Sequence, residues 1–259
     1  LLRTSPQADV YITGCHAEEA HAELATLPEL AGRHFSLYGN DRKDLLMAQA
    51  IAGTHTSDVG HVSSAREITR LPLALFARRT RAFLRIQDGC NAFCSYCIVP
   101  STRGRSRSLP ADEVVAQARL FAESGHLEVV LTGIHLGLYG LELSPPDSLV
   151  RLVDRLTAEL PQLRFRISSL EPMEISDALL ELIGERDNLM PHLHIPLQSG
   201  CDRILRAMNR RYTTRQFRGC RSVTSTSFPI RVVRGPRRQR CPARSKRAKK
   251  SGGQSSCAS

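Results

Sequence analysis

The chain has 259 residues, which is enough for one large domain or two of ordinary size. Hydrophobic residues make up 41% of it and charged residues 24%, so the composition excludes wholesale disorder and allows a sizeable core. No stretch reaches the ~18 apolar residues that a membrane span needs, and the polar first residues argue against a secretory signal peptide. We therefore expect a cytoplasmic protein with no membrane partner. The chain begins with Leu rather than Met, which suggests a missing start.

The first fifty residues have the pattern of part of a small α/β domain. Short β-rich runs predict strands at 9–13 and 34–38, and helices are predicted at 17–27 and from a capping Asp41 to about residue 51. We interpret residues 1–53 as the remnant of an amino-terminal domain. Residues 54–79 carry no steady period, and we predict a linker there.

Residues 80–217 repeat a strand-then-helix pattern. Strands are predicted at 82–86, 129–132, 165–168 and 192–197, with amphipathic helices after them that begin near Pro110, Asp147, Ser176 and Ile204. Repeated βα units imply a parallel sheet whose functional site lies at the carboxyl ends of the strands. Four strands are too few to close a barrel, so the predicted fold class is α/β, an incomplete (β/α) barrel.

The net charge of +11 is confined to the carboxyl-terminal segment. Residues 218–259 hold twelve Lys and Arg and no acidic residue, which leaves 24 basic against 25 acidic residues in 1–217. Three interpretations stay open: a basic nucleic-acid-binding arm, a solvated low-complexity tail, or the product of a frameshift. The abrupt loss of acids and of any hydrophobic period favours the frameshift, and we expect a disordered basic tail.

Three of the eight cysteines, Cys90, Cys94 and Cys97, crowd into the loop after the first strand of the repeat. Without a secretory signal, such a trio favours metal or redox chemistry over structural disulfides. Three thiolates can hold three irons of a [4Fe–4S] cube and leave the fourth open, as a catalytic centre requires. The alternative is a structural zinc site or inert thiols, although no second C-x2-C or H-x3-H pair accompanies the trio.

The pattern C-x3-C-x-aromatic-C, with Tyr96 as the aromatic residue, resembles the radical S-adenosylmethionine enzymes. Neighbouring segments resemble the methylthiotransferase branch of that family, and most of all its members that modify threonylcarbamoyladenosine in tRNA. These segments are 87–100, 103–105, 131–137, 167–172 and 194–200. The resemblance covers about residues 9–217.

This resemblance implies a partial radical-SAM barrel with a [4Fe–4S] cluster on the three cysteines and S-adenosylmethionine at the open iron. In the family, one-electron reduction cleaves the sulfonium and releases a 5′-deoxyadenosyl radical. The implied reaction adds a methylthio group to C2 of N6-threonylcarbamoyladenosine at position 37 of tRNA. The implied partners are tRNA and an electron donor such as flavodoxin or ferredoxin, and the oligomeric state stays open. A non-catalytic iron–sulfur RNA-binding protein and an inactive gene fragment are the alternatives.

The resemblance also assigns roles to single residues. Contacts to S-adenosylmethionine are expected from Tyr96, Gly133, Ser169, Glu171 and Gln198, and contacts to tRNA phosphate from Arg103, Arg105 and Arg107. Cys15 resembles the third ligand of a second, sulfur-donating cluster, whose other two ligands would precede residue 1. We therefore expect that second cluster to be incomplete, and methylthiolation not to be completed by this chain alone.

Overall fold

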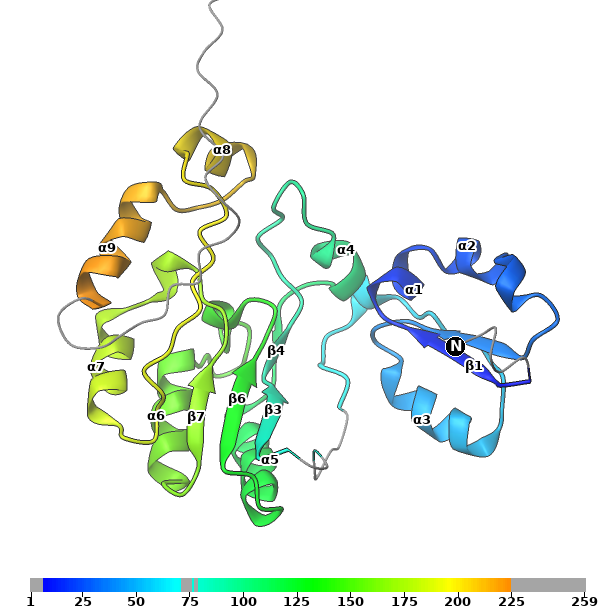
Figure 1. The fold of residues 1–259 in the computed structure, drawn as a ribbon, viewed down its shortest axis with the longest axis horizontal. Helices are drawn as coiled ribbons and strands as arrows, with labels where there is room; N and C mark the ends of the chain where they lie inside the picture. Colours follow the sequence, from blue (N-terminus) through cyan, green and yellow to red (C-terminus); the bar gives the residue numbers. More distant parts are fainter. Residues whose placement is uncertain (1–6, 71–75, 77–78, 225–259) are drawn as a thin grey trace, which may run out of the picture.

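The computed structural model describes residues 7–70, 76 and 79–224, which form two units side by side (Figure 1). The smaller, amino-terminal unit lies at one end of the long axis. The larger unit holds a parallel sheet with its helices and contains the larger of the two hydrophobic cores. Within the described ranges, no helix combines the length and the apolar character that crossing a bilayer requires.

The amino-terminal unit is a two-stranded parallel sheet with flanking helices. Its strands are β1 (Val10–Thr13) and β2 (Phe35–Tyr38), which confirms both predicted strands. Its helices are α1 (Cys15–Glu19), α2 (His21–Ala25), the 3-10 turn η1 (Pro28–Leu30) and α3 (Lys43–Ala52). The prediction of one helix over 17–27 is wrong, because the backbone leaves helical geometry at Ala20 (φ −117°, ψ 31°).

The chain beyond α3 returns to this small sheet. Asp58 forms a parallel bridge with Tyr38 and makes backbone hydrogen bonds to the residues on either side of it. Part of the predicted linker 54–79 therefore packs as a member of the amino-terminal unit. Asp41 does not cap α3 as predicted, because its carboxylate accepts a hydrogen bond from the backbone N–H of His61 instead.

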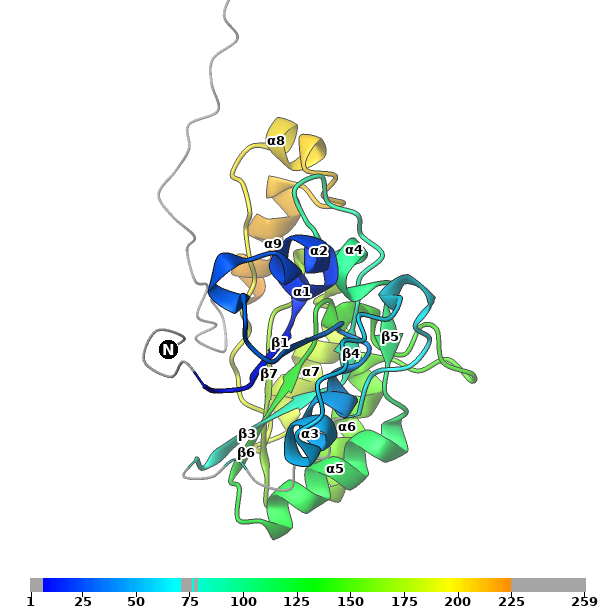
Figure 2. The same cartoon turned by 90° about the vertical axis from the view of Figure 1, so that its right-hand side faces the viewer.

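The larger unit is built on three parallel strands in the order β3-β6-β7. They are β3 (Arg81–Arg85), β6 (Glu128–Thr132) and β7 (Arg164–Ile167), which confirms the first three predicted strands of the repeat. The helices α5 (Ala111–Glu123), α6 (Leu149–Glu159) and α7 (Asp177–Glu185) follow them in turn. Figures 1 and 2 show these helices on one side of the sheet, as in part of a (β/α) barrel.

Apolar stripes on the helices explain this packing. Each helix buries one stripe against strand side chains such as Val129 and Phe165, within a single hydrophobic cluster. Ser148 caps α6, next to the predicted start at Asp147, because its hydroxyl accepts the backbone N–H of Arg151. Ser176 caps α7, at the predicted start of that helix.

The prediction of a fourth regular strand at 192–197 is wrong. His194 of this segment forms an isolated parallel bridge with Ser169, just beyond β7, and Leu189, before the segment, forms another with Phe165 of β7. Pro191 and Pro196 interrupt the segment, and proline has no N–H to donate to a ladder. The described sheet therefore ends in an irregular edge.

Short elements form the loops at the carboxyl ends of the strands. They are β4 (Gln87–Asp88), β5 (Arg107–Ser108), α4 (Val99–Arg103), and the 3-10 turns η3 (Leu136–Leu138) and η4 (Pro172–Glu174). A further 3-10 turn, η2 (Val62–Ser64), lies between α3 and β3 and contacts α4. The described chain ends with α8 (Asp202–Ala207) and α9 (Thr214–Thr224). Helix α9 continues past Phe217, where the sequence pattern predicts that regular structure stops. The rest of the predicted tail lies outside the described residues.

Candidate functional site

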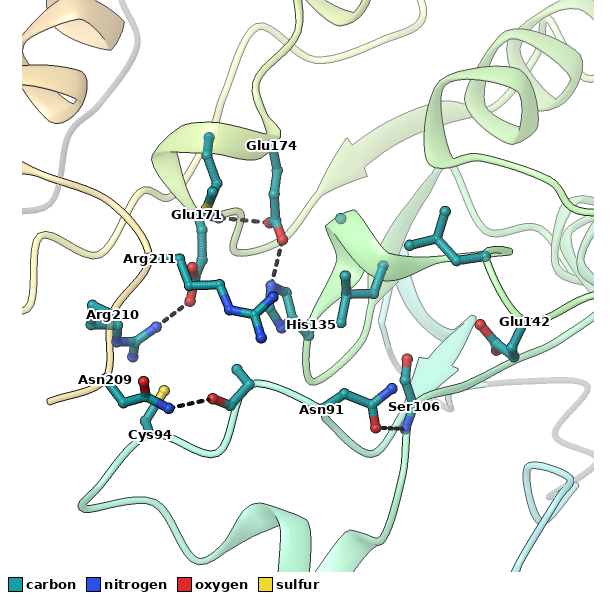
Figure 3. Close-up of a pocket in the computed structure, with 15 residues that line it drawn as sticks. Asn91, Cys94, Ser106, His135, Glu142, Glu171, Glu174, Asn209, Arg210 and Arg211 are labelled. Carbon is teal, nitrogen blue, oxygen red and sulfur yellow. Dashed lines mark hydrogen bonds and ion pairs between the residues drawn. The ribbon is translucent and has the colours of Figure 1, made fainter. Parts of the chain in front are cut away.

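A cavity of about 480 Å³ opens at the carboxyl ends of the parallel strands (Figure 3). Its wall is formed by segments that follow β3, β6 and β7, together with the residues just after α8. The polar residues lining it are Asn91, Cys94, Ser106, His135, Glu142, Glu171, Glu174, Asn209, Arg210 and Arg211. This is the size of a small-molecule site, at the end of the sheet that the sequence predicts.

The cysteine loop is anchored by residues far along the chain. The hydroxyl of Ser95 donates to the carbonyl of Ala207 at 3.0 Å, at the end of α8. The amide of Asn209 donates to two loop carbonyls, including that of Phe93 at 3.0 Å. Phe93 has φ 47°, in the left-handed region that non-glycine residues rarely adopt. These bonds therefore hold the loop in a conformation that it would not adopt alone.

Gln87 is fully buried and ties three loops together. Its Nε2 donates to the carbonyl of Gly89 at 2.8 Å and to the hydroxyl of Ser106 at 3.0 Å. Its Oε1 accepts the backbone N–H of His135 at 2.8 Å. A Cβ on Gly133 would lie 2.9 Å from this Oε1, so the close approach of the two loops requires glycine there.

His135 joins Cys90 to an acidic side chain. Its Nδ1 lies 3.4 Å from the Sγ of Cys90. Its Nε2 pairs with the carboxylate of Glu174 (Figure 3). Burial lowers the pKa of His135, but Cys90 and Glu174 outweigh it and raise the pKa to about 10. Burial raises the pKa of the Cys90 thiol, but hydrogen bonds from His135 and a loop N–H more than offset it and lower the pKa. The surroundings therefore favour the thiolate, which is the metal-binding form.

Arg210 links the cavity wall to the cysteine loop. Its guanidinium donates to the carboxylate of Glu171 and to the hydroxyl of Tyr96, and lies 5.7 Å from the centre of the Tyr96 ring. The Nε of Arg210 is buried and has no hydrogen-bond partner in the described part of the chain. An unpaired buried N–H costs about 1–3 kcal/mol. An acceptor group on a ligand in this cavity would remove that cost.

The three loop thiols suit a cluster better than a single ion. Cys90, Cys94 and Cys97 are free, and Cys94 lines the cavity. Thiolates on one tetrahedral zinc, each about 2.3 Å from the ion, would lie roughly 3.8 Å apart. The three sulfur atoms do not gather within 4.8 Å of one another. A cluster distributes its thiolates over separate irons, so wider spacing fits it. Cys201 is disulfide-bonded and stands apart from this set.

The residues expected at S-adenosylmethionine take different places. Glu171 lines the cavity, Tyr96 contacts its wall through Arg210, and Gly133 packs against Gln87 behind it. The hydroxyl of Ser169 is 2.6 Å from Nδ1 of His194. Gln198 is exposed, with φ 60°. Ser169 and Gln198 are both described by the structure, and neither of them lines this cavity.

The three arginines expected at RNA differ in exposure. Arg107 is buried, and its guanidinium donates to the carbonyls of Arg103 and Arg105 at 2.9 and 3.1 Å. Arg103 lies 3.6 Å from the carboxylate of Asp88 and 3.3 Å from the Sγ of Cys15. These contacts give both side chains structural partners. Arg105 alone of the three is exposed.

Cys15 lies beside α4, at the junction of the two units. Its Sγ accepts from Nε of Arg103 at 3.3 Å and from the amide of Asn40 at 3.8 Å. Burial raises the pKa of the Cys15 thiol, but hydrogen bonds from Thr102, Arg103 and Asn40 outweigh it, so the pKa is lowered. The amide of Asn40 also donates to the carbonyl of Thr102 at 2.6 Å, which fixes the amino-terminal unit to α4.

Four residues of this polar network escape prediction from the sequence: Gln87, His135, Glu174 and Arg210. Gln87 and His135 lie inside segments 87–100 and 131–137, which carry the resemblance, so a signal was present. Arg210 meets Tyr96 across 114 positions of sequence, and no local pattern announces that contact.

The family model for the radical SAM superfamily matches residues 84–233, which include the three thiols and most of the cavity wall. The chain belongs to the radical SAM superfamily. The match runs beyond Phe217, where the sequence pattern predicts that the resemblance ends.

Two curated relatives are similar to most of this chain. Threonylcarbamoyladenosine tRNA methylthiotransferase MtaB of Bacillus subtilis is 36% identical over 225 residues, 83% of this chain and 48% of the relative. The tRNA-2-methylthio-N(6)-dimethylallyladenosine synthase of Phocaeicola vulgatus is 32% identical over 211 residues, 79% of this chain and 45% of the relative. The chain thus spans about half the length of the curated relatives it matches.

A solved structure with a similar fold is the cobalamin-dependent S-adenosylmethionine radical enzyme OxsB. It superposes with a TM-score of 0.55 over 86% of this chain and 35% of OxsB, at 10% identity. At that identity the likeness shows the fold alone. It agrees with a parallel sheet and helices arranged as part of a radical SAM barrel.

Proposed function

We propose that this chain carries the radical-forming core of a tRNA methylthiotransferase. One observation carries the proposal: three free thiols share a loop beside a polar cavity, in a chain 36% identical to an enzyme named for that reaction. The proposed substrate is N6-threonylcarbamoyladenosine at position 37 of tRNA. Because another similar relative is named for dimethylallyladenosine, that nucleoside is the alternative substrate against which threonylcarbamoyladenosine should be tested. A tRNA substrate would place the protein in the cytoplasm.

Cys90, Cys94 and Cys97 would hold a [4Fe–4S] cluster with one open iron. Given one electron by a donor such as flavodoxin or ferredoxin, such a cluster would supply the reductive cleavage of bound S-adenosylmethionine to methionine and a 5′-deoxyadenosyl radical. The protein's part is to prepare the loop. His135 favours the thiolate of Cys90, and Asn209 fixes the loop backbone before any metal arrives.

The cavity offers both signs of charge. S-adenosylmethionine carries an ammonium, a sulfonium and a carboxylate, so it needs acidic and basic neighbours. Glu171 provides an anion at the wall, and the unpaired Nε of Arg210 provides a donor. Tyr96, Gly133, Ser169 and Gln198 stay proposed contacts on the strength of the resemblance.

The amino-terminal unit would belong to the methylthiotransferase amino-terminal domain. Cys15 is its proposed cluster ligand, and its contact with Arg103 keeps it close to the segment that follows the cysteine loop. Arg105 is the proposed phosphate contact, because it is exposed and an arginine fork suits phosphate.

Anaerobic reconstitution of the full chain with iron and sulfide tests the cluster. We expect about four irons per chain and release of methionine and 5′-deoxyadenosine under reducing conditions. Cys94→Ala should abolish both. Cys15→Ala is the matched control and should keep the cluster of the trio and the cleavage. Stoichiometric zinc without iron or sulfide would refute the proposal.

The substrate is tested by comparing tRNAs. A tRNA that carries threonylcarbamoyladenosine should stimulate 5′-deoxyadenosine release more than the same tRNA lacking the modification or one carrying dimethylallyladenosine. The reverse order would move the substrate to dimethylallyladenosine. Cleavage that no tRNA changes would support an enzyme of a different substrate class, and tight RNA binding without cleavage would support a non-catalytic binder.

A further inference from the structure

Three metal-binding side chains meet on the amino-terminal unit, away from the cysteine loop. Asp9, His34 and His55 each offer one ligand atom, and these atoms lie within 4.8 Å of one another. We propose that these three residues bind a divalent transition-metal ion, with zinc as the probe, at a site that stabilises the amino-terminal unit.

The topology of the small sheet brings the residues together. Asp9 directly precedes β1 and His34 directly precedes β2, and the parallel register sets them opposite each other. The backbone N–H of Val10 donates to the carbonyl of His34 at 3.0 Å and locks this pairing. His55 arrives from the chain that follows α3. Three segments of sequence therefore contribute one ligand each.

The distances between ligand atoms suit one shared ion. Asp9 Oδ1 lies 3.3 Å from Nε2 of His55 and 3.8 Å from Nδ1 of His34. Ligands about 2.1 Å from a tetrahedral ion are separated by roughly 3.4 Å. Two imidazoles and one carboxylate are a donor set that zinc and iron(II) accept with positions left open for water.

The ring of His55 is held in place before any ion binds. It stacks on Tyr11, with ring centres 5.6 Å apart, and the Tyr11 hydroxyl donates to the carbonyl of Thr54. This stacking fixes the orientation of the ring, whose Nε2 lies 3.3 Å from Oδ1 of Asp9.

The proposed site is separate from the cysteine chemistry. Asp9 precedes β1 and Cys15 follows it, so the four residues of the strand, at about 3.3 Å each, lie between them. An ion at Asp9 would join three segments of a unit whose hydrophobic cluster has only three buried members in the described chain, Ala17, Leu24 and Leu37. Binding to the folded state alone would then stabilise this unit.

Zinc titration of the full chain, with the iron–sulfur cluster already loaded, tests the site by calorimetry. We expect one zinc site that is weakened at least tenfold in His34→Ala and in His55→Ala. His21→Ala, an exposed histidine on α2, is the matched control and should bind zinc as the wild type does. Asp9→Asn keeps the side-chain shape, so it tests the site even if a histidine variant fails to fold. It should also weaken zinc binding.

Hydrogen exchange locates the ion. Zinc should slow exchange in residues 9–13, 34–38 and 54–58 of the wild type, and should not do so in His55→Ala. Equal zinc binding in all variants, or protection confined to residues 90–97, would overturn the proposal. Unchanged loading and S-adenosylmethionine cleavage in Asp9→Asn would show that this test is independent of the proposed function.

Discussion

Both parallel sheets have one carboxylate at the amino-terminal end of a strand, and in each it lies close to two basic side chains. In the larger unit, Glu128 of β6 pairs with Arg81 of β3 at 2.7 Å and with Arg166 of β7 at 2.9 Å. In the smaller unit, Asp9 faces two histidines. Arginine stays protonated, so the first group is a permanent ion-pair network, whereas neutral histidine can coordinate an ion. The same strand-end position therefore serves charge pairing in one sheet and offers a ligand set in the other.

The two units also differ in how they are held together. The larger unit has one continuous hydrophobic cluster shared by its three strands and their helices. The cluster of the smaller unit is small, and α3 buries no side chain. Polar contacts at the junction compensate, with Asn40 bonded to Thr102 and Cys15 to Arg103. We expect the larger unit to fold on its own core and the smaller one to depend on its neighbour.

The largest effect is expected at a glycine of the cysteine loop. Gly89 has φ 72°, and a Cβ there would lie 2.0 Å from the carbonyl oxygen of Arg105. Gly89→Ala should destabilise the larger unit by about 2–5 kcal/mol and prevent cluster loading. Gly53→Ala in the smaller unit has a similar φ of 63° but open space, so it should cost only about 1–2 kcal/mol. Urea denaturation and iron content measure both, and equal costs would contradict the steric reason.

The second prediction compares a substitution that creates a cavity in the core of the larger unit with one that does so in the smaller unit. Leu152→Ala removes a fully buried side chain and should lower the free energy of unfolding by about 2–5 kcal/mol. Leu24→Ala should shift the main unfolding transition by less than about 0.5 kcal/mol, since it opens only the smaller unit. Denaturation followed by hydrogen exchange distinguishes these outcomes. A large shift of the main transition by Leu24→Ala would mean that the units unfold together.

The third prediction concerns the junction between the two units, where Asn40 contacts Thr102. Asn40→Ala removes the hydrogen bond to Thr102 and the contact with Cys15, so the smaller unit should lose about 1–2 kcal/mol of stability. Limited proteolysis should then cleave faster between residues 54 and 70. Ser57→Ala, which removes a hydrogen bond inside the smaller unit only, is the control for docking. Equal proteolysis in the two variants would argue against Asn40 as the docking residue.

The smallest effect is a difference in acid stability. Burial raises the pKa of Glu128, but Arg166 and Arg81 outweigh it, so the folded-state pKa is lowered. A lowered carboxyl pKa stabilises the fold above the ordinary value of about 4.3, and this contribution is lost as the pH falls through the lowered pKa. Glu128→Gln should therefore lose less stability than the wild type between neutral pH and about pH 3. Parallel stability curves would show that the pair adds nothing.

The sequence by itself determined the parts that depend on local pattern. Alternating and apolar runs located β1, β2, β3, β6 and β7, because strand and helix periods are written in neighbouring residues. The spacing of Cys90, Cys94 and Cys97 identified the thiol loop and the family. The sequence pattern did not locate the helix break at Ala20 or the irregular edge after β7, because prolines and tertiary contacts override the apolar pattern there.

Only the tertiary structure decided which distant residues serve that loop. Arg210 with Tyr96, Asn209 with Phe93, and His135 with Cys90 are contacts across 114, 116 and 45 positions, and such contacts exist only after the sheet and α8 have packed. The same reason separates Arg105 from Arg107. The two are alike in sequence, yet folding exposes one guanidinium and buries the other among backbone carbonyls. Local sequence specifies which groups are available, and burial and geometry decide which of them can act.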